Sequence, residues 1–501
     1  MIALGLDCGT QSTKCIALEI ENGETLASAQ KSYGFVPGLP EGHFEQNPKD
    51  WIDAAESTIT EVLDKLGHRR KEIRAIGVSG QQHGLVALDE KNTPIRPAKL
   101  WCDTSTTKEC EEITEKMGGA ANVIAACGNA MLPGYTLPKI LWLKKNEPEN
   151  YTRVRQFLLP HDYLNFWLTR QFSMEYGDAS GTALLDVRER KWSKKLAETV
   201  DIPEQLLEKL PPLKSSVTET GLLRDKLMQK WQLDEAVLVS AGGGDNMMGA
   251  IGTGNVTPGT FTASLGTSGT LYAFSEHPII DPVGEIAAFC DSTNNWLPLV
   301  CTMNLTLVTE RIAAMGNWNH QELDRRLSAI PAGANGLLCL PYLTGERTPN
   351  LPHGSGVLHG IRTDNFDLPH LARAAAEGVT LGLGYGLSRF RELGVKATEI
   401  RLTGGGSNSP AWRQICASVF NTPVVCLKRS EGAALGAAIQ AAWTLYRNNG
   451  SDAALRDFTD RIVVTDETTR TEPKTPDVEI YQDLLIRSNK LRNTLANSGW
   501  L

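Results

Sequence analysis

Short β-type runs open the chain. Apolar residues dominate positions 2–6 and 14–20, which are joined by a turn of Gly, Thr and Ser residues. Asn22 and Gly23 then supply a second tight turn into a run at positions 25–29. Strand-like runs separated by such turns are typical of antiparallel pairing. The pattern therefore predicts a three-stranded meander at the start of the chain.

A helical pattern follows the meander. After Asn47 and Pro48, apolar residues recur every three or four positions until Gly67. Asn is a common N-cap, Pro fits a first helical turn and Gly ends helices, so we predict a helix capped by Asn47 between Pro48 and Gly67. Strands are expected at residues 73–79 and 85–88, on either side of the sequence GQQHG. These elements indicate a mixed sheet with helices packed on it.

The second half of the chain continues to alternate strands and helices. The expected elements are a helix at 368–393, a strand at 399–402, a helix capped by Ser409 that runs toward Asn421, a strand at 424–427 and a helix at 432–446. The last of these helices is rich in Ala and Gly, which would let another helix come close. The final fifty residues are polar and show no informative pattern.

One internal repeat divides the chain into two halves. LGLDCGTQS, which contains Gly9, and SLGTSGTLY, which contains Gly266, both read as a strand, a Gly-Thr turn and a second strand. The chain has 501 residues, more than one hydrophobic core usually holds. We therefore expect two related domains, at residues 1–246 and 247–501, that face each other across a cleft. The Gly-rich stretch near residues 246–255 is expected to form the boundary and a hinge.

Composition and charge exclude several classes of protein. The apolar share of 41%, which becomes about 48% when Gly is counted in place of Tyr, fits a globular chain. The net charge of −8 with no basic run argues against nucleic-acid binding. No segment is long and apolar enough to predict a membrane span. Asp7 falls where a signal peptide would be purely apolar, and the ten Cys residues form no CxxC pair. We expect a cytoplasmic protein.

Three Gly-rich loops follow expected strands. They span residues 9–12, 266–269 and 404–408. In the first, backbone N–H groups of the turn, that of Gln11 included, can point at a phosphate. Thr10, Ser12 and Lys14 add hydroxyl and ammonium donors there. The third loop precedes a helix N-terminus, where phosphates commonly bind. Each loop alone could be an ordinary turn, but the three together favour nucleotide binding. The sequence has no Gly-Lys dipeptide, which excludes a P-loop.

Two aspartates stand at the ends of expected strands. Asp7 lies beside the first loop, where a carboxylate would repel a phosphate unless Mg²⁺ lay between them, often through water. Asp245, in GGGDN, has no bulky neighbour and could accept a proton from a sugar hydroxyl during phosphoryl transfer. A turn-forming Asp is the alternative for each. The sequence therefore predicts catalytic and metal-binding roles for Asp7 and Asp245.

A polar set beside a tryptophan suits a sugar. His83 in GQQHG and Asp103 in LWCDT lie near strand ends, and Trp101 could cover the C–H face of a polyol with its indole ring. A partly buried, hydrogen-bonded histidine is the alternative for His83. The set predicts that the acceptor is a small polyhydroxylated molecule.

At these residues the chain resembles the FGGY carbohydrate kinases. Residues 134–146, GYTLPKILWLKKN, satisfy the first signature of that family, and residues 356–377 satisfy the second except at Ala376, where a larger apolar residue is usual. The resemblance covers about residues 2–445. It implies an α/β fold of two actin-like, RNase H-like domains, each a mixed sheet flanked by helices, with an active-site cleft between the domains.

The resemblance also assigns roles to residues. GQQHG is similar to the GQMHG of family members that phosphorylate xylulose, with Gln82 in place of Met, which implies that Gln82 and His83 contact a ketose. It implies that Asp245 is the proton acceptor with Asn246 beside it on the sugar, and that Asp7 acts on Mg-ATP. The residues implied to line the ATP site are Thr10, Gly266, Thr267, Gly404, Gly405 and Asn408.

Together these observations predict an enzyme that uses ATP and Mg²⁺ to phosphorylate a small ketose. D-xylulose, converted to D-xylulose 5-phosphate, is the expected substrate. A sibling kinase for ribulose, another ketose or a polyol is one alternative, and an actin- or chaperone-like nucleotide switch is another. Partners are expected to be the sugar and ATP, with no nucleic acid or membrane, and a homodimer stays open.

Overall fold

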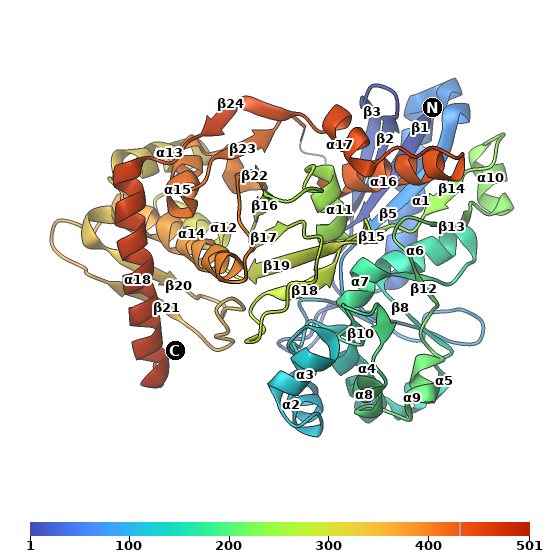
Figure 1. The fold of residues 1–501 in the computed structure, drawn as a ribbon, viewed down its shortest axis with the longest axis horizontal. Coiled ribbons are helices and arrows are strands. Elements are labelled where there is room, and N and C mark those ends of the chain that lie inside the picture. Colours follow the sequence, from blue (N-terminus) through green and yellow to red (C-terminus); the bar gives the residue numbers. More distant parts are fainter. Residues whose placement is uncertain (430–431) are drawn as a thin grey trace. The chain divides into compact units, whose positions relative to one another are not determined.

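The computed structural model describes residues 1–429 and 432–501. The chain forms two compact units (Figure 1). Unit 1 contains Met1–Thr257, Phe274–Pro298 and residues 431–463, and unit 2 contains Pro258–Ala273, residues 299–430 and Val464–Leu501. Residues 247–257 and two later segments, all of which were expected in the second domain, thus pack with the first half of the chain.

Unit 1 is built on a mixed sheet. Its strand order is β13 (Glu219–Leu222), β14 (Leu238–Ser240), β5 (Ile73–Gly80), β1 (Ile2–Cys8), β2 (Ser12–Glu19) and β3 (Thr25–Ser32), and β15 (Gly243–Gly244) also pairs with β5. β1, β2 and β3 are antiparallel neighbours, which confirms the predicted meander. β1 and β14 run parallel to β5, so the sheet is mixed, as expected.

Helices cover both faces of this sheet. α1 (Pro48–Leu66) buries its apolar stripe, including Trp51, with Leu4 and Leu6 of β1. α16 (Gly432–Asn448) packs with Ala3, which points to the opposite face because side chains alternate along a strand. The helix predicted between Pro48 and Gly67 is confirmed, but the side chain of Asn47 makes no capping hydrogen bond.

Shorter elements complete unit 1. Its helices are α2 (Thr107–Lys116), α3 (Ala120–Cys127), α4 (Thr136–Asn146), α5 (Pro148–Arg153), α6 (Pro160–Thr169), α7 (Tyr176–Ser180), α8 (Lys194–Glu198), α9 (Pro203–Leu207), α10 (Asp225–Trp231), α11 (Asp245–Gly252) and α17 (Leu455–Ile462). Its short strands are β4 (Glu45–Gln46), β6 (Val86–Leu88), β7 (Ala98–Lys99), β8 (Gln156–Leu158), β9 (Met174–Glu175), β10 (Leu185–Asp186), β11 (Lys191–Trp192), β12 (Leu213–Lys214) and β18 (Ala287–Cys290).

Unit 2 has a sheet of the same kind. β16 (Thr260–Leu265) pairs antiparallel with β17 (Gly269–Ala273) and parallel with β22 (Glu399–Thr403). This repeats the arrangement of β1, β2 and β5, as the sequence repeat predicts. The remaining elements are β19 (Trp296–Thr302), β20 (Leu338–Pro341), β21 (Gly356–His359), β23 (Val424–Leu427), β24 (Thr465–Thr471), α12 (Thr306–Met315), α13 (His320–Ala329), α14 (Leu368–Glu392), α15 (Pro410–Phe420) and α18 (Thr475–Asn497).

The stretch expected to act as a hinge contains a helix. Asp245–Gly252 forms α11, which packs against α16 within unit 1. The Ala- and Gly-rich surface of α16 makes this close packing possible, as its sequence suggests. The first border between the two units along the chain follows α11, between Thr257 and Pro258.

Candidate active site

The first Gly-rich loop is held in place by side chains from outside its own hairpin. The Tyr33 hydroxyl donates a hydrogen bond to the carbonyl of Gly9 at 2.6 Å, and the amide of Gln46 donates to the carbonyl of Thr10 at 2.6 Å. The indole N–H of Trp101 donates to the Thr10 hydroxyl oxygen at 2.9 Å. These contacts use carbonyl and hydroxyl oxygens of the loop. The hydrogen bond from Trp101 connects this loop, which is expected to bind phosphate, to a residue that is expected to bind the sugar.

Asp7 lies at the end of β1 and is half-buried. Its Oδ1 accepts a hydrogen bond from the hydroxyl of Ser79, the neighbouring residue on β5, at 2.8 Å. Burial raises the pKa of Asp7, and the Ser79 hydrogen bond and the positive charge of Lys14 oppose this rise. Ser79 was not predicted from the sequence, although its place at the end of a strand next to GQQHG was a usable signal.

Asp245 begins α11, directly after β15. Because β15 pairs parallel with the end of β5, Asp245 follows the same end of the sheet that carries Asp7. Burial raises the pKa of Asp245 to about 7, and the negative charges of Asp7 and Asp178 add to the rise. Two carboxylates that lie close enough for one to raise the pKa of the other are suited to share a cation. The two predicted aspartates are therefore electrostatic neighbours within one unit.

Asn246 connects Asp245 with Gln82. Its side-chain amide donates to Oδ1 of Asp245 at 3.0 Å and to Oε1 of Gln82 at 2.9 Å. The Nε2 atom of Gln82 is buried and has no hydrogen-bond partner among the residues that the structure describes. An unsatisfied buried donor is costly, so a ligand oxygen would be favourable there. Gly244 leaves room for this arrangement, since a Cβ on it would lie 2.6 Å from Cγ of Gln82.

His83 is buried in an aromatic setting. Its ring centroid lies 5.0 Å from that of Tyr135 and 5.6 Å from that of Phe289. Its backbone has φ of 65°, which is unusual for a residue other than Gly. His83 directly follows Gln82, so the GQQHG loop brings both expected ketose contacts to the neighbourhood of Asn246.

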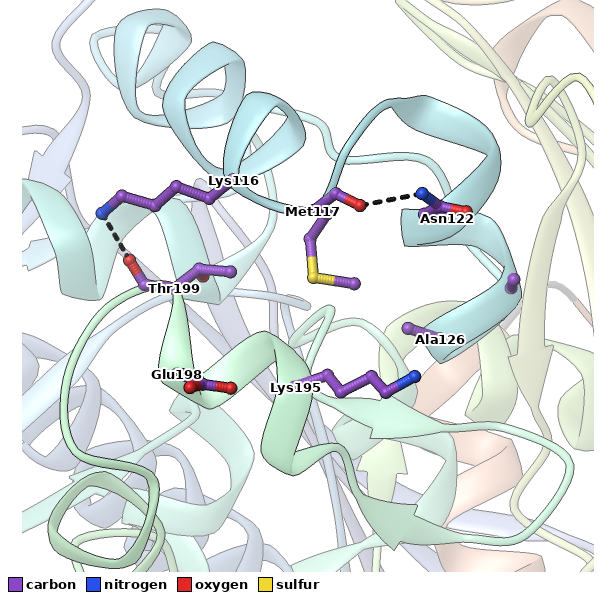
Figure 2. A pocket seen from close by; sticks show the side chains of 8 residues that line it. Lys116, Met117, Asn122, Ala126, Lys195, Glu198 and Thr199 are labelled. Atoms are coloured by element: carbon purple, nitrogen blue, oxygen red, sulfur yellow. Dashed lines mark hydrogen bonds between the residues drawn. The ribbon is translucent and has the colours of Figure 1, made fainter.

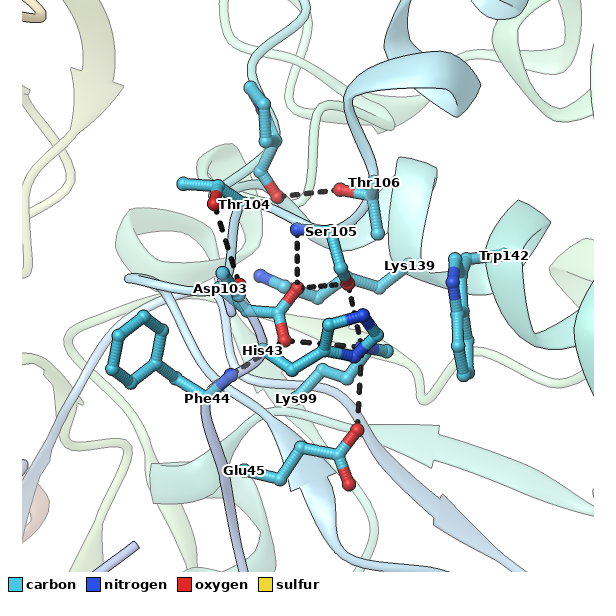
Figure 3. A network of polar contacts seen from close by, with 12 residues as sticks. His43, Phe44, Glu45, Lys99, Asp103, Thr104, Ser105, Thr106, Lys139 and Trp142 are labelled. Carbon is cyan, nitrogen blue, oxygen red and sulfur yellow. Dashed lines mark hydrogen bonds and ion pairs between the residues drawn. The ribbon is translucent and has the colours of Figure 1, made fainter. Parts of the chain in front are cut away.

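Asp103 is fully buried and bound by the protein itself (Figure 3). Its Oδ2 accepts from the backbone N–H of Phe44 at 2.9 Å and from the Lys99 ammonium at 3.1 Å. Its Oδ1 accepts from the backbone N–H of Ser105 at 3.0 Å. The carboxylate therefore fixes the turn that follows Trp101. The sequence suggested a sugar contact for Asp103 and did not indicate this structural role.

The second and third loops lie together in unit 2. The carbonyls of Gly266 and Thr267 accept hydrogen bonds from the backbone at the start of α12. Gly404 has φ of 81°, and a Cβ on it would lie 2.6 Å from the carbonyl oxygen of Leu265. Gly405–Asn408 form a 3₁₀ turn before α15, whose N-cap Ser409 accepts from the backbone N–H of Trp412. The structure thus brings together the ATP residues expected in the second half of the chain.

Gln440 is a supporting residue that sequence reasoning missed. It is fully buried in α16, and its Oε1 accepts from the hydroxyl of Ser240 at 2.9 Å and from the backbone N–H of Gly242 at 3.0 Å. Its Nε2 donates to the carbonyl of Gly242 at 3.2 Å. Gln440 therefore fixes the segment that leads to Asp245. No local motif marks it, because its partners are distant in the sequence.

A separate cavity of about 710 Å³ lies among α2, α3 and α8 (Figure 2). Its lining includes Lys116, Asn122 and Lys195 and none of the predicted site residues. The Lys116 ammonium is hydrogen bonded to the carbonyl of Thr199 at 2.8 Å.

In the described part of the chain, no helix combines the length and the apolar character needed to cross a membrane.

Known proteins resemble this chain over nearly its whole length. It is 40% identical to the xylulose kinase of Haemophilus influenzae over 484 residues, which cover 96% of this chain and 97% of that protein. It is 36% identical to the xylulose kinase of Bacillus subtilis, with 88% of this chain and 87% of that protein covered. A crystal structure described as a xyloylose kinase from Brucella ovis superposes with a TM-score of 0.91 at 31% identity, covering 99% of this chain and 100% of that one.

Family models match both halves. Residues 2–252 match the N-terminal domain of the FGGY family of carbohydrate kinases, and residues 261–445 match its C-terminal domain. These matches confirm the resemblance seen in the sequence motifs. They favour a carbohydrate kinase over an actin- or chaperone-like nucleotide switch. The chain belongs to the FGGY family of carbohydrate kinases.

Proposed function

We propose that this chain is an ATP-dependent xylulose kinase. It transfers the γ-phosphoryl group of ATP to the terminal hydroxyl of D-xylulose and releases D-xylulose 5-phosphate and ADP. The relatives named xylulose kinase support the substrate. The observation that carries the proposal is the hydrogen-bonded set of Gln82, Asn246 and Asp245, with Asp7 as the electrostatic neighbour of Asp245.

Asp245 is the proposed proton acceptor. Its pKa of about 7 lies near the range in which a general base is most effective, and Asn246 fixes one of its oxygens through two hydrogen bonds. The other oxygen is then available to orient the sugar hydroxyl. The hydroxyl proton passes to Asp245 as the sugar oxygen attacks the γ-phosphorus in line.

Asp7 and Asp245 are the proposed holders of Mg²⁺. Both are carboxylates, the donor type that Mg²⁺ prefers. Burial and the negative charge of Asp7 raise the pKa of Asp245, and a cation would relieve the repulsion between the two groups. The protein would hold the ion with these two groups through water. A bound Mg²⁺ would neutralise phosphate charge during transfer.

ATP is the second substrate, and we assign it to the Gly-rich loops. The proposed contacts are Thr10, Gln11, Ser12 and Lys14 in unit 1, and Gly266, Thr267, Gly404, Gly405 and Asn408 in unit 2. Backbone N–H groups of such loops bind phosphate oxygens without the entropy cost of ordering long side chains. In unit 1 the loop's carbonyls are already bound by Tyr33 and Gln46, which holds the turn in one conformation.

The sugar site is proposed to comprise Gln82, His83, Trp101 and Asn246. The buried, unpaired Nε2 of Gln82 is a donor for a sugar oxygen. Trp101 is half-buried and fixed by its hydrogen bond to Thr10, so its ring can cover C–H groups of the sugar. We leave Asp103 out of the direct contacts, because both of its oxygens are occupied by protein donors.

A sugar panel with coupled detection of ADP tests this function. D-xylulose should give the highest kcat/KM among D-xylulose, D-ribulose, other ketoses and polyols. A preference for ribulose or a polyol would contradict the assignment of D-xylulose as the substrate, but the assignment of kinase activity would stand. ATP hydrolysis that does not depend on any sugar would contradict the proposal.

We also propose a cytoplasmic location, where ATP is supplied.

A further inference from the structure

Lys139 is a fully buried lysine whose ammonium group binds two backbone carbonyls. It lies on α4 and donates hydrogen bonds to the carbonyl of His83 at 3.0 Å and to the carbonyl of Gly134. Burial lowers the pKa of Lys139 to about 7, although the negative charge of Asp103 opposes this. Lysines are rarely buried without an ion-pair partner, because desolvation of the ammonium is expensive. The two carbonyl contacts of Lys139 are therefore the interactions that offset the cost of its burial.

Lys99, the other fully buried lysine nearby, shows the contrast (Figure 3). Its ammonium lies 3.3 Å from Oε1 of Glu45 and 3.1 Å from Oδ2 of Asp103, so two carboxylates offset its burial. His43, Glu45 and Asp103 bring metal-type ligand atoms within 4.8 Å of one another, and the Lys99 ammonium is the cation among them. Lys99 therefore stabilises a structural cluster, whereas Lys139 binds the backbone of His83.

The backbone that Lys139 binds is strained. His83 has φ of 65°, a left-handed conformation that is unfavourable for a residue with a side chain. Its carbonyl accepts a second hydrogen bond from the Thr136 hydroxyl at 3.2 Å. On the ring side, Tyr135 lies edge-on, and a Cβ on Gly181 would overlap the imidazole. Donors from the first turn of α4 thus fix the carbonyl while neighbouring residues fix the ring.

We propose that Lys139 and Thr136 are positioning residues that hold His83 in its left-handed conformation and so aim its imidazole at the sugar. This inference rests on the proposed function of His83 as a ketose contact. Without the two donors, the backbone of His83 can relax to an ordinary conformation, and the ring then turns with it. Loss of these two donors should weaken sugar binding. It should leave ATP binding unchanged, because the first Gly-rich loop is held by other residues.

Replacement of Lys139 by Met tests the proposal. Lys139→Met keeps the length of the side chain and removes its donors. The KM for D-xylulose should rise about tenfold, the effect of losing a charge-assisted hydrogen bond, while the KM for ATP stays within about twofold. Lys145→Met, the same change at an exposed position of α4 that pairs with Glu112, is the matched control and should change neither constant. Equal rises in both KM values for Lys139→Met would overturn the proposal.

Two further variants make the outcome decisive. Thr136→Val removes the second donor with little change in shape and should also raise the KM for D-xylulose. This variant keeps the proposal testable if Lys139→Met does not fold. In a His83→Ala background, Lys139→Met should have no further effect on that KM, and an undiminished effect would show that it does not act through His83. A wild-type enzyme that is inactive on D-xylulose would refute the proposed function, whereas an active one with an unchanged KM in Lys139→Met and Thr136→Val would refute only this inference.

Discussion

Gly436 of α16 lies directly against the backbone of Met248 in α11. A Cβ on Gly436 would overlap the Met248 carbonyl oxygen, and one on Gly252 would overlap the carbonyl of Gly432. The two helices therefore touch backbone to backbone. Because α11 begins with Asp245, the position of the proposed base depends on the absence of side chains in this contact.

Enlargement of Gly436 should destabilise unit 1. Gly436→Val forces the helices apart, and overpacking of this kind typically lowers the free energy of unfolding by about 1–3 kcal/mol. Urea denaturation measures the change, and kcat should fall as α11 shifts. Gly34→Ala is the control, because nothing lies within 4 Å of a Cβ at that position. An equally stable and active Gly436→Val enzyme would show that the contact does not position Asp245.

Removal of the Asp245 carboxylate should strongly reduce turnover. Asp245→Asn keeps the shape of the side chain but cannot accept the sugar proton, and loss of a general base lowers kcat about 10²- to 10⁴-fold. ATP binding, followed by isothermal calorimetry, should persist. Asp460→Asn, at an exposed ion pair with Arg456, serves as the control. Near-normal turnover of Asp245→Asn would remove Asp245 from this role.

The activity should fall on the acidic side of pH 7. Burial and the charges of Asp7 and Asp178 raise the pKa of Asp245 to about 7, so the carboxylate form needed for proton acceptance is lost as the pH drops through that value. The acidic limb of kcat/KM for D-xylulose measures this pKa. Asp178→Asn removes one repulsive charge and should move the limb to lower pH. A limb that stays in place or moves upward would contradict this electrostatic coupling.

The hydrogen bond between Trp101 and Thr10 should support both substrates. Trp101→Phe keeps an aromatic ring but loses the N–H group, so the loop and the ring are no longer connected. We expect the KM values for ATP and D-xylulose to rise by roughly 2- to 10-fold each, the usual effect of one neutral hydrogen bond. Thr10→Val should reproduce the rise, and the double variant should be no worse than either single one. Additive losses would show that the two residues act separately.

Depletion of divalent cations should stop catalysis. Treatment with EDTA removes the ion that Asp7 and Asp245 are proposed to hold, and added Mg²⁺ should restore turnover. Asp7→Asn should raise the Mg²⁺ concentration needed for half-maximal activity, because one of the two carboxylates is lost. Titration of the rate with Mg²⁺ at fixed ATP measures this. Full activity of the enzyme in excess EDTA would refute the metal assignment.

Local patterns were sufficient to predict much of the fold. The hairpin of β1 and β2, α1, α14 and α15 each carry their own signals, namely turn residues, helical spacing or a capping residue such as Ser409. The repeat around Gly9 and Gly266 likewise predicted the matching hairpins. Asp7 and Asp245 could be singled out because they follow short-range strand and loop patterns.

Residues whose importance depends on distant partners could not be found in this way. Gln440 and Ser79 lie in ordinary helix and strand sequence. Lys139 lies within the family signature at residues 134–146, but only the folded chain shows what these three side chains bind. Asp103 illustrates the opposite case. Its type and its neighbour Trp101 suggest a ligand contact, but the sequence does not show that Lys99 and Phe44 already occupy its carboxylate.

The use of α16 to complete unit 1 has a consequence for synthesis of the protein. The ribosome makes β1, β5 and Asp245 long before it reaches Gln440, the residue that binds the segment ahead of Asp245. Until then the sheet face around Ala3 lacks its covering helix and exposes apolar surface. A nascent chain that ends before residue 448 should therefore be inactive and prone to aggregate, and chaperones should bind it during translation.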